Sequence, residues 1–426
     1  MRLLIFSLYY APEEAGNAPY ITGVAEHFAA SGHEITVVAG MPHYPDWRVR
    51  DGYRGALQRR EVRNGVTIRR RWHYVPDKQS ALRRAAYEAT GFAGGIGALG
   101  LKRPDAIIGV VPALSDAMLA RTAAARFGAP YGLVFQDVIS RGAAQSGVAG
   151  GEKVARQAAH AEGWAVRGAA RVGVVAEGFR PHLMDLGAEP EAIVRLRNWT
   201  TIPPAAAPPA DTRRRFGLPV DGVVCLHAGN MGHKQGLENI VECARVARGA
   251  ADDRLSFVLL GDGNQRRELE KLAAAHDLPN LRFLPVQPLQ ELADLLQASD
   301  VLLVNQRPAV GDMSLPSKLT AYLPSGRPVV AAVAADSEAA LEVTASGGGV
   351  VVAPGDSSAL LNAIQRLADD GEQAQTLARR GRSYARRVLA RPAALAGYDD
   401  LLARVVASRS FSVDSGAATT WQATGP

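Results

Sequence analysis

The stretch with the clearest chemical potential is "GNMGHKQG", residues 229–236. Glycine lets backbone N–H groups approach an anion closely, and a helix starting behind such a turn directs its positive end at the same point. The stretch follows an apolar run, precedes a helix-like one and carries one cation, Lys234. We interpret it as a candidate phosphate cradle, although turns of this composition also occur where nothing binds.

Other polar turns follow later apolar runs in the same half of the chain. They are "GDGNQRREL" at 261–269, "PVQP" at 285–288 and "NQRPAVGDMSLPSK" at 305–318, which ends in Lys318. Ligands of parallel sheets bind outside the carboxyl ends of the strands, where such turns lie. A single "GDG" is more typical of an ordinary strand-ending turn, so the prediction depends on the whole set.

Strand-like and helix-like stretches, which must position these turns, alternate along most of the chain. Short Val/Ile/Leu runs, such as "RLLIFSLYY", "EITVVAG" and "DAIIGVV", are separated by helix-like stretches, which is typical of buried parallel strands in an α/β fold. The alternation pauses in the proline-rich residues 198–219 and then restarts with "GVVCLHAGN". We therefore expect two doubly wound, Rossmann-like domains with a ligand cleft between them, followed by helices and a small, polar tail.

Length, composition and cysteine count disfavour disordered, disulfide-rich, secreted and membrane-spanning proteins. The 426 residues suit two domains, and 47% hydrophobic with 21% charged residues indicates a globular chain. Only two cysteines occur, so neither a metal site nor a disulfide framework is expected, and a reducing cytosol fits. The first apolar run ends at Tyr9-Tyr10-Ala11-Pro12, which favours a buried strand over a signal peptide. No run approaches the roughly 20 apolar residues that span a bilayer.

Positive charge is concentrated in one segment. Residues 48–71 contain nine arginines against Asp51 and Glu61, and a weakly apolar stretch with further basic residues follows at 80–103. Such a segment favours an anionic partner: a membrane surface, a pyrophosphate lipid or a nucleic acid. A solvated arginine-rich surface explains it equally well. We retain the membrane surface or a lipid-linked acceptor as the predicted partner and expect no nucleic acid.

Taken in order, several stretches resemble glycosyltransferase family 4. The N-terminal "YYAPEEAGNAPYITGVAEHFAASGHEITVVAG" is followed by "VVAEGFRPHLMDLGAEPEAIVRLRNW", "LLGDGNQRRELEKLAAAHDLPNLRFLP", "LADLLQASDVLLVN" and "PSKLTAYLPSGRPVVA". The resemblance covers residues 1 to about 405. "MPHYPDW" and "GNMGHKQGLE" are similar to the branch with colanic-acid and O-antigen transferases of bacterial surface polysaccharide assembly.

The resemblance implies a GT-B fold and retaining sugar transfer from a nucleotide diphosphate sugar, UDP being favoured over GDP. The acceptor-side domain would span residues 1–199 and the donor-binding domain 200–384. Residues 385–405 would form a helix that returns to the first domain, and 406–426 a disordered tail. No cofactor is expected. Without an Asp-x-Asp motif, protein cations and helix dipoles rather than a metal would stabilise the departing diphosphate. The enzyme would be cytoplasmic, with the inner membrane face as a possible peripheral location, and its oligomeric state is left open.

The same resemblance assigns site residues. The catalytic candidates are Lys318, Lys234, Asp137 and Gln136. The expected donor-binding residues are Gly16, Asn17, Gly229, Asn230, Met231, Gly232, Gly261, Gly263, Leu284, Pro285, Asp312, Met313, Ser314 and Ser317. The expected acceptor contacts are His43, Tyr44 and Trp47, for which packing beneath their loop is an equal alternative. Asp137 has the alternative role of capping the next helix.

The chain departs from the family pattern at four positions. Asn230 and Gln235 stand where arginine and lysine are usual, and Met313 and Ala321 stand where many members have glutamates, the second of which holds the ribose. Asp312 is expected to substitute for one carboxylate, with Glu338 as a weaker candidate. The departures leave three alternatives open: a soluble secondary-metabolite acceptor, a sugar-nucleotide epimerase and a non-catalytic nucleotide-binding protein. A dehydrogenase is disfavoured because no complete Gly-x-Gly-x-x-Gly precedes an acidic ribose ligand.

Overall fold

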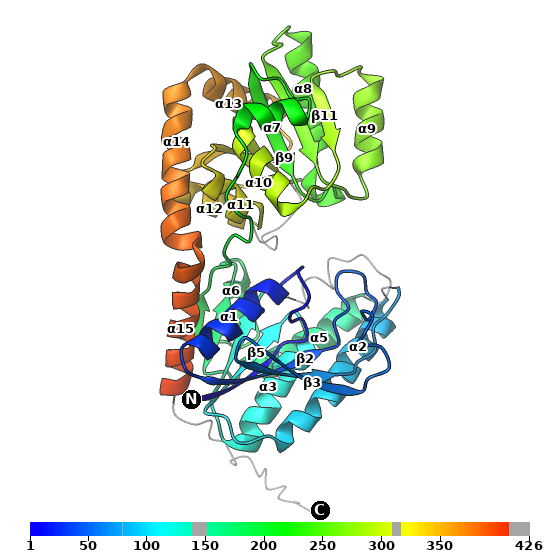
Figure 1. Cartoon of the computed structure of the whole chain (residues 1–426), viewed down its shortest axis with the longest axis vertical. Helices are drawn as coiled ribbons and strands as arrows, with labels where there is room; N and C mark the ends of the chain where they lie inside the picture. Colours follow the sequence, from blue (N-terminus) through cyan, green and yellow to red (C-terminus); the bar gives the residue numbers. More distant parts are fainter. Residues whose placement is uncertain (79, 139–150, 309–316, 409–426) are drawn as a thin grey trace, which may run out of the picture. The chain divides into compact units, whose positions relative to one another are not determined.

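The computed structural model of the chain describes residues 1–78, 80–138, 151–308 and 317–408 (Figure 1). It divides into two compact units. Unit 1 comprises Met1–Leu196 and the chain from Leu395 onward, and unit 2 comprises Arg197–Ala394. Asp312, Met313, Ser314 and residues 409–426 of the expected tail lie outside the described residues.

Unit 1 is built on an eight-stranded sheet of order β3-β4-β2-β1-β5-β6-β7-β8. Its strands are β1 (Arg2–Phe6), β2 (Glu34–Gly40), β3 (Gln58–Arg63), β4 (Val66–Arg71), β5 (Ala106–Val111), β6 (Tyr131–Phe135), β7 (Arg171–Val174) and β8 (Ile193–Arg195). The helices are α1 (Ala18–Ala30), α2 (Ala81–Gly95), α3 (Leu114–Phe127), α5 (Gly151–Val166), α6 (Phe179–Asp185) and α15 (Arg391–Ala407), with short turns η1 (Ile96–Gly100) and η2 (Pro190–Ala192). The chain order reverses at β1, between β2 and β5, which puts the ligand-binding edge of this sheet at the loops after β1 and β5.

The arginine-rich segment forms a β-hairpin that the strand pattern did not predict. Strand β3 pairs antiparallel with β4, whereas every other strand pair described in the two sheets is parallel. Asn64 and Gly65 form the turn with φ of 46° and 80°. These positive values at both central residues are typical of Asn-Gly hairpins.

Unit 2 has a six-stranded parallel sheet of order β11-β10-β9-β12-β13-β14. Its strands are β9 (Val223–Ala228), β10 (Leu255–Leu260), β11 (Leu281–Leu284), β12 (Val301–Asn305), β13 (Val329–Ala332) and β14 (Gly349–Val352). The helices are α7 (Pro209–Arg215), α8 (Glu238–Gly249), α9 (Arg266–Ala275), α10 (Leu289–Ala298), α11 (Ser317–Ser325), α12 (Glu338–Ser346), α13 (Ser357–Asp369) and α14 (Gly371–Tyr384), with a short turn η3 (His233–Gln235) and a π-helical turn η4 (Ala385–Leu389). Here the order reverses between β9 and β12, so the loops after these strands flank the expected ligand crevice.

Both faces of the unit 2 sheet are buried. Cys225 and Leu303 pack with Ile240 of α8 in one apolar cluster, while Leu226 and Leu302 pack with Tyr322 of α11 in another. Alternate residues of one strand thus serve opposite faces, as a sheet with helices on both sides requires. Both cysteines are free and buried, and burial raises the pKa of the Cys243 thiol to about 12.

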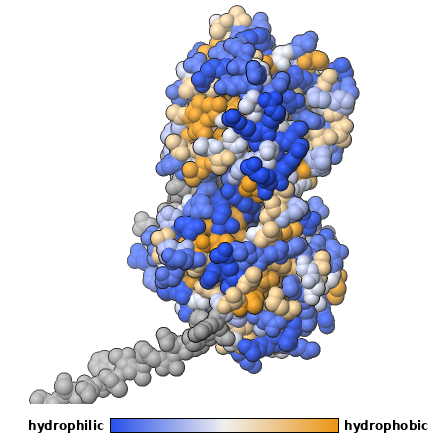
Figure 2. Space-filling model, turned by 90° about the vertical axis from the view of Figure 1, so that its left-hand side faces the viewer, coloured by the Kyte–Doolittle hydropathy of each residue, from blue (hydrophilic) through white to orange (hydrophobic). Residues whose placement is uncertain are grey.

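In the described part of the chain, no helix is both long and apolar enough to cross a bilayer. The face drawn in Figure 2 carries hydrophobic and hydrophilic residues interspersed.

Candidate functional site

Three parallel strands of unit 2 end at the same level. The register pairs Ala228 at the end of β9 with Leu260 of β10, and Leu260 with Leu284 of β11. Gly229, Gly261 and Pro285 therefore follow the strand ends side by side, as the loop pattern predicts.

Glycine is required where these loops touch. Gly229 and Gly261 have φ of 136° and 134°, values that side-chain-bearing residues rarely adopt. A Cβ on Gly261 would overlap the carbonyl oxygen of Gly229, and one on Gly263 would lie 2.5 Å from the carbonyl oxygen of Met231. Met231 N–H donates to Asp262 O at 2.7 Å and Gln265 N–H donates to Met231 O at 2.9 Å. The two glycine turns thus form one backbone surface.

Lys318 of α11 lies against this surface. Its Cε and Nζ are 2.9 Å and 3.5 Å from the position that a Cβ of Gly229 would take. Burial lowers the pKa of the Lys318 ammonium from 10.5 to about 8. No carboxylate among the described residues pairs with it. The structure therefore provides a desolvated cation at the glycine turns that an anion would stabilise.

His227, two residues before Gly229, is packed inside the sheet. Its Nδ1–H donates to Leu303 O at 3.1 Å. Burial, with a smaller contribution from the charge of Lys318, lowers the pKa of His227 to about 3. The imidazole is therefore neutral and leaves Lys318 as the cation at this point.

Lys234 has a different environment. It lies in turn η3, where its side chain is exposed. Its backbone carbonyl accepts a hydrogen bond from Arg307 N–H at 3.0 Å. Asn305 Nδ2 donates to the carbonyls of Gln235 and Gly236 at 2.7 and 2.8 Å. The backbone of the turn is therefore fixed from β12, while the Lys234 ammonium stays in solvent. Nearby, Asn230 is exposed and its Nδ2 lies 2.8 Å from the position of a Cβ on Gly232.

The structure adds Arg266 to the site residues expected from the sequence. Its Nη1 donates to Gly261 O at 2.6 Å and to Leu284 O at 3.2 Å, so one guanidinium joins the loops after β10 and β11. Its only sequence signal is its position, three residues after Gly263. Pro285 is exposed, and Ser317 begins α11. Glu338 begins α12 with 3% of its surface exposed.

In unit 1, Glu13 organises the loops after β1 and β2. Its Oε1 accepts from the N–H groups of His43 and Tyr44 at 2.7 and 2.8 Å, and its Oε2 accepts from Tyr10 N–H at 3.3 Å. Burial raises the pKa of Glu13, although these bonds oppose the shift. Gly16 has φ of 65°, and a Cβ there would lie 3.2 Å from the Tyr44 ring. Asn17 precedes α1 and is buried, with Nδ2 unpaired among the described residues.

His43, expected as an acceptor contact with packing beneath its loop as the equal alternative, is buried in the structure. Only 1% of the residue is exposed. Its Nδ1–H donates to Met41 O at 2.9 Å, its Nε2 lies 3.1 Å from Tyr87 Oη, and burial lowers its pKa to about 4. His43 thus holds the loop from inside, whereas Tyr44 and Trp47 stay partly exposed.

Gln136 and Asp137 follow β6. Gln136 Nε2 donates to Tyr398 Oη of α15 at 3.3 Å. Asp137 is exposed, and its Oδ1 accepts from Val138 N–H at 2.8 Å. Residues 139–150, where Asp137 was alternatively expected to cap the next helix, lie outside the described residues. Among the residues described, no cluster of three or more His, Cys, Asp or Glu side chains could hold a metal ion.

Comparison with known proteins accounts for both units. Residues 15–199 match the glycosyl transferase 4-like domain, and residues 210–384 match glycosyl transferases group 1. The colanic acid biosynthesis glycosyl transferase WcaI of Escherichia coli K12 is 33% identical over 377 residues, which cover 86% of this chain and 92% of WcaI.

Solved structures share the fold at lower identity. Sucrose-phosphate synthase from Thermosynechococcus elongatus aligns with a TM-score of 0.69 and 18% identity over 95% of this chain and 98% of its own. Anabaena HepE in complex with UDP aligns with a TM-score of 0.68 and 16% identity over 95% and 100%. The chain therefore belongs to the group 1, family 4 glycosyltransferases and has the GT-B fold.

Proposed function

We propose that the protein moves a sugar from a nucleotide diphosphate sugar, with UDP favoured over GDP, to a saccharide acceptor of bacterial surface polysaccharide assembly. The observation that carries the proposal is the buried ammonium of Lys318 over Gly229, at the carboxyl end of β9. WcaI, by its name, acts in colanic acid biosynthesis, and the HepE structures contain UDP and UDP-glucose. Both agree with a nucleotide sugar as donor.

In this proposal the diphosphate lies on the backbone of the two glycine turns. Lys318 stabilises the negative charge that develops as the bond to the sugar breaks, and the positive charge comes from the protein rather than from a metal. Two nearby carboxylates are engaged elsewhere: Glu238 pairs with Arg307, and Asp262 Oδ1 accepts from Gly263 N–H at 2.7 Å. We therefore favour a front-face displacement with retention, in which the leaving diphosphate accepts the proton of the acceptor hydroxyl.

The arginine-rich hairpin supports an acceptor that carries phosphate. The register pairs Arg60 with Arg69 and Gln58 with Arg71, so these four side chains share one face of the β3–β4 pair. They line a cavity of about 200 Å³ beside Gly94 and Gly97. Arg60 and Arg69 are exposed, and no carboxylate among the described residues pairs with them. A lipid-linked saccharide phosphate at the inner, cytoplasmic membrane face fits this charge, and a soluble acceptor is the alternative.

Calorimetry with UDP and GDP, followed by donor hydrolysis and NMR of the anomeric product, tests the donor and the stereochemistry. The proposal expects tighter binding of UDP, slow hydrolysis of a UDP-sugar and a product with the donor's anomeric configuration. Absence of binding at millimolar nucleotide would instead indicate a non-catalytic protein, and conversion of the sugar nucleotide without acceptor an epimerase.

Flotation with anionic vesicles separates the two acceptor classes. Binding that is lost when Arg60 and Arg69 are both replaced by Gln would support the lipid-linked acceptor. If the protein does not bind the anionic vesicles at low salt, the soluble acceptor is favoured instead.

A further inference from the structure

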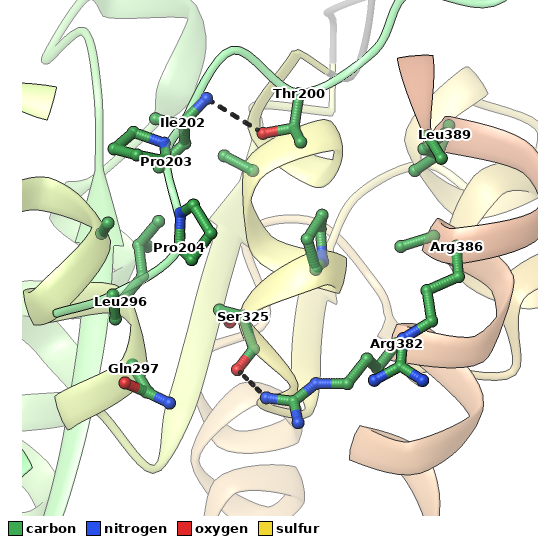
Figure 3. Close-up of a pocket in the computed structure, with 16 residues that line it drawn as sticks. Thr200, Ile202, Pro203, Pro204, Leu296, Gln297, Ser325, Arg382, Arg386 and Leu389 are labelled. Atoms are coloured by element: carbon green, nitrogen blue, oxygen red, sulfur yellow. Dashed lines mark hydrogen bonds between the residues drawn. The ribbon is translucent and has the colours of Figure 1, made fainter. Parts of the chain in front are cut away.

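A cavity of unit 2 lies away from the glycine turns. It has a volume of about 460 Å³ and is shown in Figure 3. Its walls are residues 200–205, the last turns of α10 and α11, and the stretch where α14 passes into η4. Helices α10 and α11 end where β12 and β13 begin, so the cavity lies at the amino edge of the sheet. The donor loops lie at the opposite, carboxyl edge.

The polar part of this cavity is cationic. Arg382 and Arg386 line it from α14 and η4, and none of the sixteen lining residues is acidic. Arg382 Nη2 donates to Ser325 O at 2.9 Å (Figure 3). Arg386 is exposed, and no carboxylate in the described part of the chain pairs with it. Two arginines four positions apart lie on the same side of a helical stretch, so their guanidinium groups offer several donors to one oxyanion.

Most of the remaining lining residues are apolar, apart from Thr200, Gln297 and Ser325. In the view of Figure 3, Ile202, Pro203 and Pro204 of the connecting segment lie on the same side as Leu296, and Leu389 lies on the opposite side. Thr200 Oγ1 accepts from Ile202 N–H at 3.2 Å, which fixes the bend of that segment. The volume falls within the range of about 300–1,000 Å³ of small-molecule sites, and apolar walls with a few converging polar groups are their usual composition.

The cavity also involves an uncommon backbone feature. Ala385, Arg386 and Leu389 belong to the π-helical turn η4, and such turns are frequent at functional sites. The chain enters unit 2 at Arg197 and leaves it at Ala394. Lining residues such as Thr200, Ile202, Leu389 and Ala390 therefore lie within a few positions of the two ends of unit 2.

We propose that this cavity binds an amphipathic anion, an apolar molecule that carries one phosphate or carboxylate group. The oxyanion would bind Arg386 and Arg382, and the apolar part would lie against the connecting segment and Leu296. The proposal does not depend on the identity of the sugar donor, because no lining residue belongs to the glycine turns.

Titration calorimetry with octyl phosphate tests the proposal, with saturating UDP present so that the donor loops do not compete. Octyl phosphate and octanoate are expected to bind more tightly than octanol, which lacks the charge, and than inorganic phosphate, which lacks the chain. Arg386→Ala should weaken binding by roughly tenfold to a hundredfold, as for the loss of a charged hydrogen bond. Arg387→Ala is the matched control, because Arg387 is exposed on the same turn and does not line the cavity.

A variant that fills the cavity tests whether binding needs the space in the cavity as well as its positive charge. Ala205→Leu adds an apolar side chain to the connecting segment while both arginines remain, and it should abolish binding of octyl phosphate without changing UDP binding. The proposal is overturned if octyl phosphate binds no better than octanol, or if its affinity is unchanged in both Arg386→Ala and Ala205→Leu. Binding to vesicles of anionic phospholipid but not to octyl phosphate or octanoate would also contradict it, since a membrane surface would then be the ligand.

Discussion

Replacing Lys318 with methionine should raise the stability of the free protein and lower its activity. Methionine retains an unbranched apolar chain that can pack against Gly229, but it removes the buried ammonium. The lysine pKa falls from 10.5 to about 8 on burial. At about 1.36 kcal/mol per pKa unit, the charged form is disfavoured by at most roughly 3–4 kcal/mol in the free protein. Because Lys318 as a whole residue keeps part of its surface exposed, we expect a smaller gain, on the order of 1–2 kcal/mol in the free energy of unfolding.

The size of this effect depends on pH. Below about pH 8 the ammonium is charged in both folded and unfolded chains, and the burial cost is fully present. Between about pH 8 and 10.5 the unfolded chain binds the additional proton, so the wild-type protein gains stability with rising pH. The stability advantage of Lys318→Met should therefore be largest at and below pH 7 and should shrink above pH 8. Chemical denaturation of both proteins at pH 7 and pH 9.5 measures it.

Activity should change in the opposite direction. Loss of the cation that stabilises the departing diphosphate should reduce turnover by roughly one to three orders of magnitude, measured as hydrolysis of the sugar donor. Lys234→Met is the control, since that lysine is exposed on the neighbouring turn, and it should lose much less. Wild-type turnover and UDP affinity in Lys318→Met would refute the assignment of this lysine. If Lys318→Met were less stable than the wild type at pH 7, the argument that burial of the ammonium destabilises the free protein would be refuted.

Three further outcomes are expected. UDP affinity should fall as pH rises through about 8, by at most roughly tenfold per pH unit, because only the charged form of Lys318 attracts the diphosphate. Calorimetry in buffers of different ionisation enthalpy should show that UDP binding takes up a proton. A UDP affinity that stays constant from pH 7 to 9.5 would contradict the role of Lys318 in binding the diphosphate. Gly261→Ala should cost about 2–4 kcal/mol of stability and abolish UDP binding, because the added Cβ overlaps Gly229 O at a positive φ. Gly249→Ala, whose Cβ would meet nothing within 4 Å, should be neutral or slightly stabilising, and equal losses in the two variants would refute the steric argument. Tyr322→Phe should cost about 1–3 kcal/mol, measured by denaturation, because its hydroxyl bonds both Ala228 N–H and Ala228 O at the end of β9.

The parallel strands were predictable because their burial on both faces leaves continuous apolar runs in the sequence. The β3–β4 hairpin was missed for the converse reason. Strand β3 is exposed along almost its whole length and carries arginines instead of an apolar face. The Asn64-Gly65 pair was the one local signal, and it acquires meaning only once the flanking residues are accepted as strands.

The placement of the candidate loops at the strand ends was predictable, but the contacts between them were not. That Gly229 and Gly261 must be glycine follows from backbones that meet 32 positions apart in the chain. His43 is buried among rings that include His73 and Tyr87, which lie 30 and 44 positions away, so no local pattern reveals its burial. The sequence does not reveal the role of Arg266, because its bonds to Gly261 O and Leu284 O are to backbone atoms and need no particular partner side chain.

The hairpin arginines also affect how the folded chain avoids association. Strand β3 is the outer strand of the unit 1 sheet, and its outer backbone groups could pair with a strand of another molecule. Arg59, Arg60 and Arg63 keep this open edge highly charged, so two copies that approach edge to edge repel each other. Substitutions that neutralise the hairpin would therefore have a second effect, which is a tendency to aggregate at low salt.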